Sequence, residues 1–249
     1  MIVTAYKTKK VVTGSQLLPL LDKYLPRLQE QSVVVVTSKI ISICQGRVVK
    51  NDGSVDKKRL IQCEADLYME DAANEKWGII LTVKNDTLVA SAGIDESNGN
   101  GYFILWPEDP PRAAREIWQH LRQQHGVKDL GVIITDSHTA PLRWGTSGIG
   151  IAWCGFEPLH SYIDTPDIFG RNLHVTKASV LDGLAAAAVL VMGEGKEQTP
   201  LAVVTDVPFV QFTDHSPTAQ EIKNFHITLT EDIFAPLIDS PRWKKGGRK

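Results

Sequence analysis

The stretch GVIITDSHTAPLRWGTSGIG, residues 131–150, combines the pattern of a buried strand with a dense run of polar and glycine residues. Its β-branched start, VII at 132–134, is typical of a strand buried within an α/β sheet. Asp136 and Ser137 follow at the end of that strand, where α/β sheets bind their ligands. The later glycines indicate backbone that turns tightly or packs closely. The stretch therefore predicts an α/β fold with a polar site, although Asp136 alone also fits an Asx turn or a helix cap.

A chain of 249 residues, 43% of them hydrophobic, is long enough to bury a proper core. Its net charge of -2 gives no indication of nucleic acid or an anionic membrane as a partner. No apolar run reaches the length of a membrane span, and the first residues lack the pattern of a secretory signal, so we expect a cytoplasmic protein without a membrane partner. Cys44, Cys63 and Cys154 have no paired spacing, which argues against a disulfide scaffold or a thiolate zinc site.

A second apolar run, SVVVVTS at residues 32–38, predicts another buried strand that ends in hydroxyl groups. Lys39 follows directly, and residues 40–47 (IISICQGR) are expected to continue the strand as far as the turn signal at Gly46. Two interpretations of Lys39 remain open, a solvated charge at a strand end and a cation that binds phosphate.

An oxygen-rich loop, SAGIDESNG at residues 91–99, follows two further strand-like pieces at 78–83 and 87–90. Carboxylate, amide and hydroxyl oxygens are the donors that Mg²⁺ and Mn²⁺ prefer. The loop therefore indicates a candidate cation site, with Asp95 near its centre, while a plain acidic surface turn remains open.

The most apolar predicted helix covers residues 177–192, KASVLDGLAAAAVLVM. Asp182 lies within it, and an acid in so apolar a helix needs a partner or a ligand. The sequence GEGKE follows, in which Gly193 is a good helix terminator and Glu194 lies in a loop. Between the central stretch and this helix, Arg171 lies in a glycine-punctuated acidic loop, which fits either an anion clamp or an internally paired surface loop.

Five motifs together resemble the coenzyme F420-0:γ-glutamyl ligase family, in the family's order and over nearly the whole chain. Each motif alone is weak, but the set is specific. They are KIIS with QGR (39–47), SAGIDESN (91–98), GVIITDS (131–137), DIFGRNLHVT (167–176) and LAAAAVLVMGEG (184–195).

This resemblance implies an α/β (α+β) fold of mixed sheets and helices, in which residues 1–249 form a single catalytic domain of two closely associated lobes and an intertwined homodimer. It also implies GTP or ATP as cosubstrate, one or two Mg²⁺ or Mn²⁺ ions, and no P-loop; consistently, the chain contains no GxxxxGK[ST]. The implied metal ligands are Asp95, Asp136, Ser137 and Glu194. The implied nucleotide-binding residues are Ser38, Lys39, Asn98, Met192, Gly193, Gly195 and Lys196. We expect substrate contacts from Arg143 and Arg171.

The implied reaction joins L-glutamate to a carboxylate of a cofactor acceptor. A carboxylate is unreactive toward an amine, so it is first phosphorylated by the nucleotide, and glutamate nitrogen then displaces phosphate from the acyl phosphate. Negative charge on the transferring group requires cations, which explains the proposed metals and Lys39. Asp136, Lys39 and Asp182 are assigned catalytic roles, Asp182 by orienting a ligand or a metal-bound water. No covalent enzyme nucleophile is needed.

Three departures from the family pattern affect substrate choice. Ile43 and Gln45 occupy places where the family often has Lys and Glu, and Gly183 replaces an acid. These changes leave the implied metal ligands intact, so we expect activity to survive while the preference for acceptor or nucleotide shifts. The expected acceptor is F420-0 or a folate-type or pterin-type compound, and the departures favour the second. The alternatives are a non-catalytic cofactor-binding member of the same fold, and another reaction such as phosphate release by the same metals.

Overall fold

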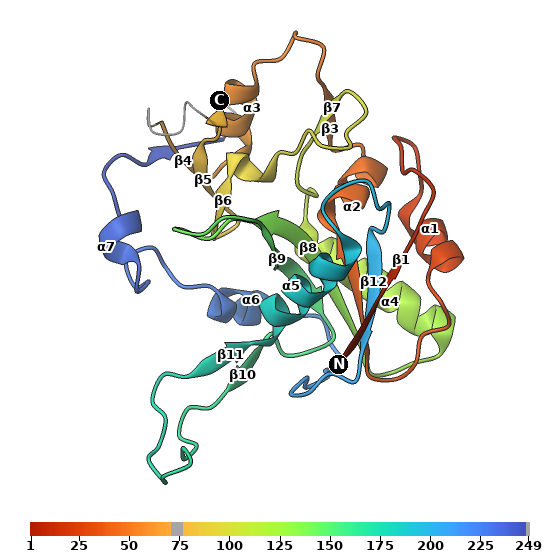
Figure 1. The fold of residues 1–249 in the computed structure, drawn as a ribbon, viewed down its shortest axis with the longest axis vertical. Coiled ribbons are helices and arrows are strands. Elements are labelled where there is room, and N and C mark those ends of the chain that lie inside the picture. Colours follow the sequence, from red (N-terminus) through yellow and green to blue (C-terminus); the bar gives the residue numbers. More distant parts are fainter. Residues whose placement is uncertain (71–76, 248–249) are drawn as a thin grey trace.

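A mixed five-stranded sheet forms the centre of the computed structural model, which describes residues 1–70 and 77–247 (Figure 1). Its strands run in the order β1-β12-β2-β8-β9. Their bounds are β1 (Ile2–Tyr6), β2 (Ser32–Thr37), β8 (Leu130–His138), β9 (Ser147–Cys154) and β12 (Leu201–Thr205). Strands β2 and β8 are parallel, and the other pairs are antiparallel. The two stretches predicted to be buried strands are therefore neighbours, and their carboxyl ends meet at the same edge.

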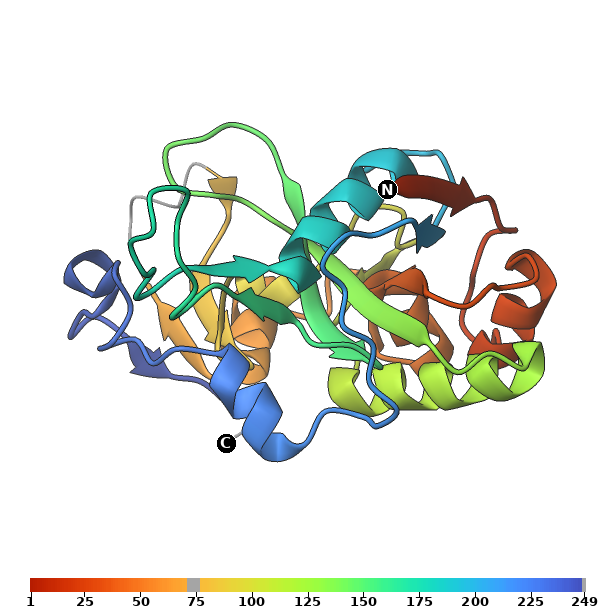
Figure 2. The ribbon, with the colours of Figure 1, turned by 90° about the horizontal axis from the view of Figure 1, so that it is seen from below.

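Helices cover both faces of this sheet. Helices α1 (Leu17–Tyr24), α2 (Ser38–Gln45) and α4 (Pro110–His125) pack on one face, and α5 (Val180–Met192) and α6 (Ala219–Phe225) on the other. In Figure 2, the lime helix α4 and the cyan helix α5 lie on opposite sides of the sheet. Alternate side chains of β2 point to opposite faces, so Val34 contributes to the core under α4 and Val35 to the core under α5. The predicted α/β class is confirmed.

Residues 40–47 form most of a helix, which corrects the expectation that they continue strand β2. Helix α2 spans Ser38–Gln45 and is followed by Gly46, whose φ of 72° is the left-handed conformation that terminates helices. Ile40 and Ile41 are buried in the core beside β2, and this burial outweighs the strand preference of β-branched residues. Lys39 therefore lies in the first turn of a helix, immediately after the sheet edge.

A second, smaller sheet lies beside the first, in the order β13-β4-β5-β6. A separate apolar cluster forms beneath it, around Ile61 and Phe103. The elements of this region are β3 (Val48–Lys50), α3 (Lys57–Glu64), β4 (Leu67–Met69), β5 (Leu81–Lys84), β6 (Thr87–Ala90), the short 3-10 helix η2 (Ser91–Gly93), β7 (Tyr102–Ile104) and β13 (Lys244–Lys245). The two strand-like pieces predicted at 78–83 and 87–90 pair as the hairpin β5–β6, although β5 begins only at Leu81, and the hairpin leads through η2 into the oxygen-rich loop.

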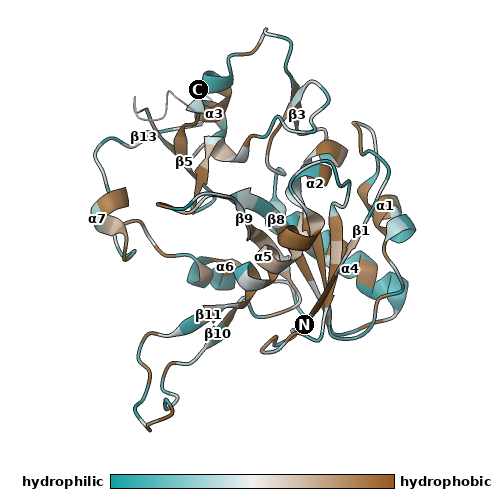
Figure 3. Cartoon of the chain, viewed as in Figure 1, coloured by the Kyte–Doolittle hydropathy of each residue, from teal (hydrophilic) through white to brown (hydrophobic). Residues whose placement is uncertain are grey.

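An arm extends from the main body between β10 (Leu159–Ser161) and β11 (Lys177–Ser179) (Figure 1). Helix α5 therefore begins three residues later than its predicted start, because residues 177–179 pair in the arm. The remaining helix is α7 (Ala235–Ile238). Figure 3 shows the strongest apolar colouring on the central strands. Within the described ranges, none of the helices has the length and apolarity that crossing a membrane requires.

Two glycines of β9 allow α5 to lie directly on the sheet. A Cβ at Gly148 would lie 2.5 Å from the carbonyl oxygen of Ala185, and one at Gly150 would lie 2.4 Å from Cγ of Leu181. The predicted close approach of this glycine-rich stretch is therefore confirmed, and the approaching neighbour is helix α5.

Candidate active site

Four segments that are far apart in the sequence meet beside the carboxyl end of β8. They are the first turn of α2, the acidic loop (residues 94–99), the end of β8 at Asp136 and Ser137, and the glycine-rich loop (residues 193–197). Direct side-chain contacts join them, so the sequence motifs form one site.

Lys39 links helix α2 to the acidic loop. Its Nζ lies 2.6 Å from Oδ2 of Asp95 and donates to the carbonyl and hydroxyl oxygens of Ser97, each at 3.0 Å. Loss of water raises the pKa of Asp95, but the hydrogen bond and charge of Lys39, together with two hydrogen bonds from Ser97, outweigh this effect, and the net pKa lies below the usual value. Asp95 is therefore ionised at neutral pH, and its carboxylate is paired with the ammonium group of Lys39.

Asp136 lies deeper in the same site. Its Oδ2 accepts a hydrogen bond from Nε1 of Trp106. Loss of water around the carboxylate raises its pKa to about 6, and the negative charge of Asp95 adds to this effect, while the Trp106 bond and the charge of Lys39 oppose it. The charged form of Asp136 is thus short of positive partners, and an added cation would stabilise it.

The glycine-rich loop approaches the site from the end of α5. Ser137 Oγ donates to Glu194, 2.8 Å from Oε1 and 2.9 Å from Oε2, and Thr146 Oγ1 lies 3.3 Å from Oε1. Asn98 Nδ2 donates to the Gly195 carbonyl at 2.9 Å. These bonds place the Glu194 carboxylate beside the strand that carries Asp136.

The residues expected to contact a nucleotide belong to the segments that meet in this site, with one difference. Ser38 and Lys39 occupy the first turn of α2, where unpaired backbone N–H groups favour an anion. Gly193, Gly195 and Lys196 are exposed in the loop after α5. The Met192 side chain is buried in the core under α5, so this residue offers a ligand its main chain only.

Three sequence-predicted residues take part in other contacts. Arg143 lies in the exposed loop between β8 and β9, and Arg171 lies in the arm, where its backbone N–H donates to Asp167. Asp182 accepts hydrogen bonds from the Gly150 N–H at 3.1 Å and from Ser179 Oγ at 2.8 Å. The partner that Asp182 required is therefore the backbone of β9, beside the irregular register between β8 and β9.

The donor chemistry of this site fits a hydrated divalent cation. Within residues 1–70 and 77–247, no three Asp, Glu, His or Cys side chains already converge as a metal-binding group. Mg²⁺ in nucleotide sites commonly uses one or two carboxylates together with waters and phosphate oxygens. Asp95 and Asp136, supplemented by the Ser137 hydroxyl and Glu194, supply oxygens of that kind. The Lys39 ammonium on Asp95 shows that the site attracts positive charge.

Trp106 belongs to this site, although the sequence reasoning did not select it. The signal was present, because a buried tryptophan usually needs an acceptor for its indole N–H. Which acceptor it finds depends on tertiary structure, since Asp136 is thirty residues away.

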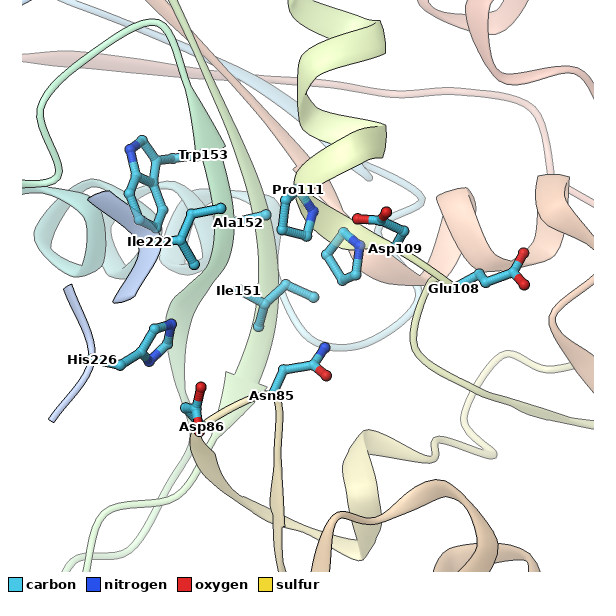
Figure 4. A pocket seen from close by; sticks show the side chains of 11 residues that line it. Asn85, Asp86, Glu108, Asp109, Pro111, Ile151, Ala152, Trp153, Ile222 and His226 are labelled. Carbon is cyan, nitrogen blue, oxygen red and sulfur yellow. The ribbon is translucent and has the colours of Figure 1, made fainter. Parts of the chain in front are cut away.

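A separate pocket of about 400 Å³ lies between β9, the start of α4, the β5–β6 turn and α6 (Figure 4). Its walls include Pro111, Ile151 and Trp153, and its rim includes Asp86 and Glu108. None of the sequence-predicted site residues lines it. Among the described residues that line it there is no Lys or Arg, so its acidic rim disfavours an anionic ligand such as a nucleotide.

The fold and the site define a mixed α/β protein that gathers carboxylates and a lysine at one edge of its central sheet. A family model described as F420-0:Gamma-glutamyl ligase matches residues 6–206. The chain belongs to this family of amide-bond-forming ligases, which confirms the resemblance seen in its motifs.

Similar proteins with assigned names carry the name of a ligase of the same kind. The coenzyme F420:L-glutamate ligase of Methanosarcina barkeri is 32% identical over 206 residues, which are 77% of this chain and 80% of that protein. The protein of the same name from Haloarcula marismortui is 34% identical over 212 residues, 78% of this chain and 81% of that one. The one from Methanopyrus kandleri is 44% identical over 126 residues, 50% of each chain.

Proposed function

We propose that this protein is a γ-glutamate ligase that uses a nucleoside triphosphate and a divalent cation to join L-glutamate to a carboxylate of a cofactor. The observation that carries the proposal is the meeting of Lys39 and Asp95 with Asp136, beside the Ser137–Glu194 pair. Family membership supplies the type of bond formed. The acceptor is F420-0 or a folate-type or pterin-type compound, and the nucleotide is GTP or ATP.

In the proposed reaction, an oxygen of the acceptor carboxylate attacks the γ-phosphorus, and the bond between that phosphorus and the β–γ bridging oxygen breaks. This step yields an acyl phosphate and a nucleoside diphosphate. The nitrogen of L-glutamate, after losing a proton, then attacks the acyl carbon and expels inorganic phosphate. When bound, Mg²⁺ or Mn²⁺ would neutralise charge on the transferring group.

Different segments of the site are assigned to the nucleotide phosphates, to the cation and to the rest of the nucleotide. The first turn of α2, with Ser38 and Lys39, faces the nucleotide phosphates, and the Lys39 charge stabilises the transferring phosphoryl group. Asp95, Asp136, Ser137 and Glu194 would hold the cation. Asn98 and the glycine-rich loop border the nucleotide.

We further propose supporting roles for the predicted residues outside this cluster. Asp182 acts through its bond to the Gly150 N–H, which ties β9 to helix α5; because β9 pairs with β8 at Asp136, this bond helps to keep Asp136 in place. Arg143 and Arg171 lie on exposed segments and are assigned to the acidic groups of glutamate or the acceptor.

We propose that residues 1–249 act as one catalytic domain of two lobes and work as a homodimer. Support for the dimer comes from the arm, in which Ile168, Phe169 and Val175 are 92%, 89% and 85% exposed. Apolar side chains gathered on a projecting segment are typical of an interface. Light scattering should give twice the chain mass, and Phe169→Asp should reduce it toward that of one chain.

Two departures from the family pattern have structural consequences in this chain. The Ile43 side chain is buried in α2, and Gln45 Oε1 accepts a hydrogen bond from the Glu108 N–H at 3.1 Å. Neither side chain offers a charge to a phosphate. We therefore expect Lys39 to be the main lysine contact of the nucleotide from this helix.

The test is mass spectrometry of reactions containing the purified chain, L-glutamate, GTP or ATP, Mg²⁺ or Mn²⁺, and F420-0 or reduced folates. We expect a product heavier by one glutamyl unit with one acceptor class. Asp136→Asn should abolish the product, and Asp129→Asn, in the exposed turn before the same strand, should not.

Other outcomes would overturn the ligase proposal. Phosphate release without glutamate incorporation would identify a phosphatase. Tight acceptor binding without nucleotide turnover would identify a non-catalytic cofactor-binding protein. An Asp136→Asn enzyme with full activity would remove the assigned role of that carboxylate.

A further inference from the structure

Trp106 lies between the two segments that carry the acids of the site. It follows β7 closely and is 1% exposed. Its indole Nε1 donates to Oδ2 of Asp136. On the other side, a Cβ at Gly93 would lie 2.0 Å from that same nitrogen. Because Gly93 is two residues before Asp95, the indole contacts the Asp136 carboxylate and the start of the acidic loop together.

Charged groups of the smaller sheet region hold the tryptophan itself. Arg47 Nε donates to the Trp106 carbonyl oxygen at 3.2 Å, and Lys84 Nζ lies 5.9 Å from the centre of the indole ring. Both cations pair with Glu64, at 2.6 Å from Arg47 and 2.8 Å from Lys84. The indole is thus anchored through its main chain and its ring, and it has little freedom to tilt.

We propose that Trp106 is a positioning residue, which fixes Oδ2 of Asp136 so that the remaining lone pairs of this carboxylate are directed to a divalent cation. The inference rests on the proposed function, because it assumes a cation at Asp136. Partners that hydrogen-bond a metal-ligating carboxylate set its orientation, and their loss commonly costs about 10–100-fold in metal affinity or activity.

A purely structural role for Trp106 would predict a loss of stability alone. The chain provides a matched control in Trp118, which is 4% exposed and whose Nε1 donates to the Leu130 carbonyl oxygen at 2.7 Å. Trp118 lies in the core under α4 and contacts none of the proposed ligands. Trp106→Phe and Trp118→Phe each remove one buried indole N–H. A difference in Mn²⁺ affinity between the two variants therefore comes from the group that accepts the hydrogen bond, Asp136 in one case and the Leu130 carbonyl oxygen in the other.

The experiment measures Mn²⁺ binding to the full chain by electron paramagnetic resonance of the free ion, alongside kcat and KM. We expect Trp106→Phe to weaken Mn²⁺ binding at least roughly tenfold and to lower kcat with little change in the KM for the acceptor. Trp118→Phe should lower the melting temperature while leaving Mn²⁺ affinity unchanged. Equal Mn²⁺ affinity in the two variants would overturn the inference.

A second variant keeps the test decisive if Trp106→Phe does not fold. Gly93→Ala retains the indole, but its methyl group would lie 2.0 Å from Nε1 at a backbone φ of 70°, so the ring must move away from Asp136 and Mn²⁺ binding should weaken. If Asp136→Asn binds Mn²⁺ as tightly as the wild type does, the metal site of the proposed function is overturned, and this inference with it. Mn²⁺ binding that requires Asp136 but is unaffected by Trp106→Phe and Gly93→Ala would overturn only the inference.

Discussion

Asn98 Nδ2 donates a hydrogen bond to the Gly195 carbonyl oxygen at 2.9 Å, across ninety-seven residues of sequence. This bond joins the acidic loop, which follows the smaller sheet, to the glycine-rich loop, which follows the helix packed on the larger sheet. Lys39 fixes the other side of the acidic loop through Asp95. The acidic loop is therefore held from two directions, and its position should depend on each bond.

Removing the Asn98 bond should weaken nucleotide binding while leaving the fold intact. Asn98 has a φ of 54°, so Asn98→Gly removes the side chain without adding backbone strain. A hydrogen bond of this kind contributes about 1 kcal/mol, so we expect the Kd of a non-hydrolysable nucleotide analogue to rise roughly three- to tenfold. The control is Asn100→Gly, in the same loop at a φ of 50°. Calorimetric titration that gave both variants the same Kd would contradict the prediction.

Glu194 should affect the metal requirement more than its loop neighbour does. Glu194→Gln removes a charge beside Ser137, and the Mg²⁺ concentration for half-maximal activity should rise at least roughly tenfold. Glu197 lies in the same loop and accepts from the Gly195 N–H at 2.8 Å, a bond that Glu197→Gln can retain. Steady-state rates over a Mg²⁺ series distinguish the two variants, and overlapping curves would argue against Glu194 as a ligand.

The positions of the site residues could be predicted from the sequence because each lies at or just beyond the carboxyl end of a regular element, although β8 continues through Asp136 and Ser137 to His138. Asp136 ends a run of β-branched residues, and Glu194 follows a helix that stops at a glycine. Family motifs then indicated which ends belong together. Helix α2 could not be predicted in this way, because Ile40 and Ile41 favour a strand locally and only their burial beside β2 decides for a helix.

The contacts behind the site were also beyond the sequence. Arg47, Glu64 and Lys84 belong to three separate segments, and nothing local to any one of them indicates the other two. The same holds for Trp106 and Asp136. Such pairings depend on how the smaller sheet region packs against the larger sheet, and periodicity and turn signals carry no information about that packing.

Protonation of Glu64 should destabilise the protein in acid. Loss of water raises the pKa of this buried carboxyl, but Lys84 and Arg47 lower it more, and the pKa in the folded state lies below the usual 4.5. Its stabilising contribution is therefore present above the unfolded pKa and is lost as the pH falls through the lower folded value. Unfolding in guanidinium chloride at a series of pH values from 7 to 3 should show this decline.

The variant Glu64→Gln should remove that pH dependence and lower stability at neutral pH. It leaves the buried Lys84 and the half-buried Arg47 without the carboxylate, and breaking a buried ion pair typically costs about 3–5 kcal/mol. Glu116→Gln is the control, because Glu116 pairs with Arg112 on an exposed helix face and should change stability by less than about 1 kcal/mol. If the free energy of unfolding of Glu64→Gln falls between pH 5 and pH 3 as steeply as that of the wild type, the acid sensitivity comes from other groups.

Substitution by alanine should lower the stability of the fold at Gly150 and raise it at Gly183. A Cβ at Gly150 would lie 2.4 Å from Leu181 Cγ, so Gly150→Ala forces β9 and α5 apart at a cost of about 1–3 kcal/mol. Gly183, inside α5, has no atom within 4 Å of an added Cβ, and Gly183→Ala should stabilise the helix by up to about 1 kcal/mol. Each kcal/mol corresponds to a melting-temperature change of roughly 2–4 °C for a chain of this size.

Because Ile149 pairs with Asp136, Gly150→Ala should also weaken Mn²⁺ binding, whereas Gly183→Ala should not. Calorimetry together with Mn²⁺ titration tests both effects, and a Gly150→Ala protein with wild-type stability and Mn²⁺ affinity would show that β9 does not support the site.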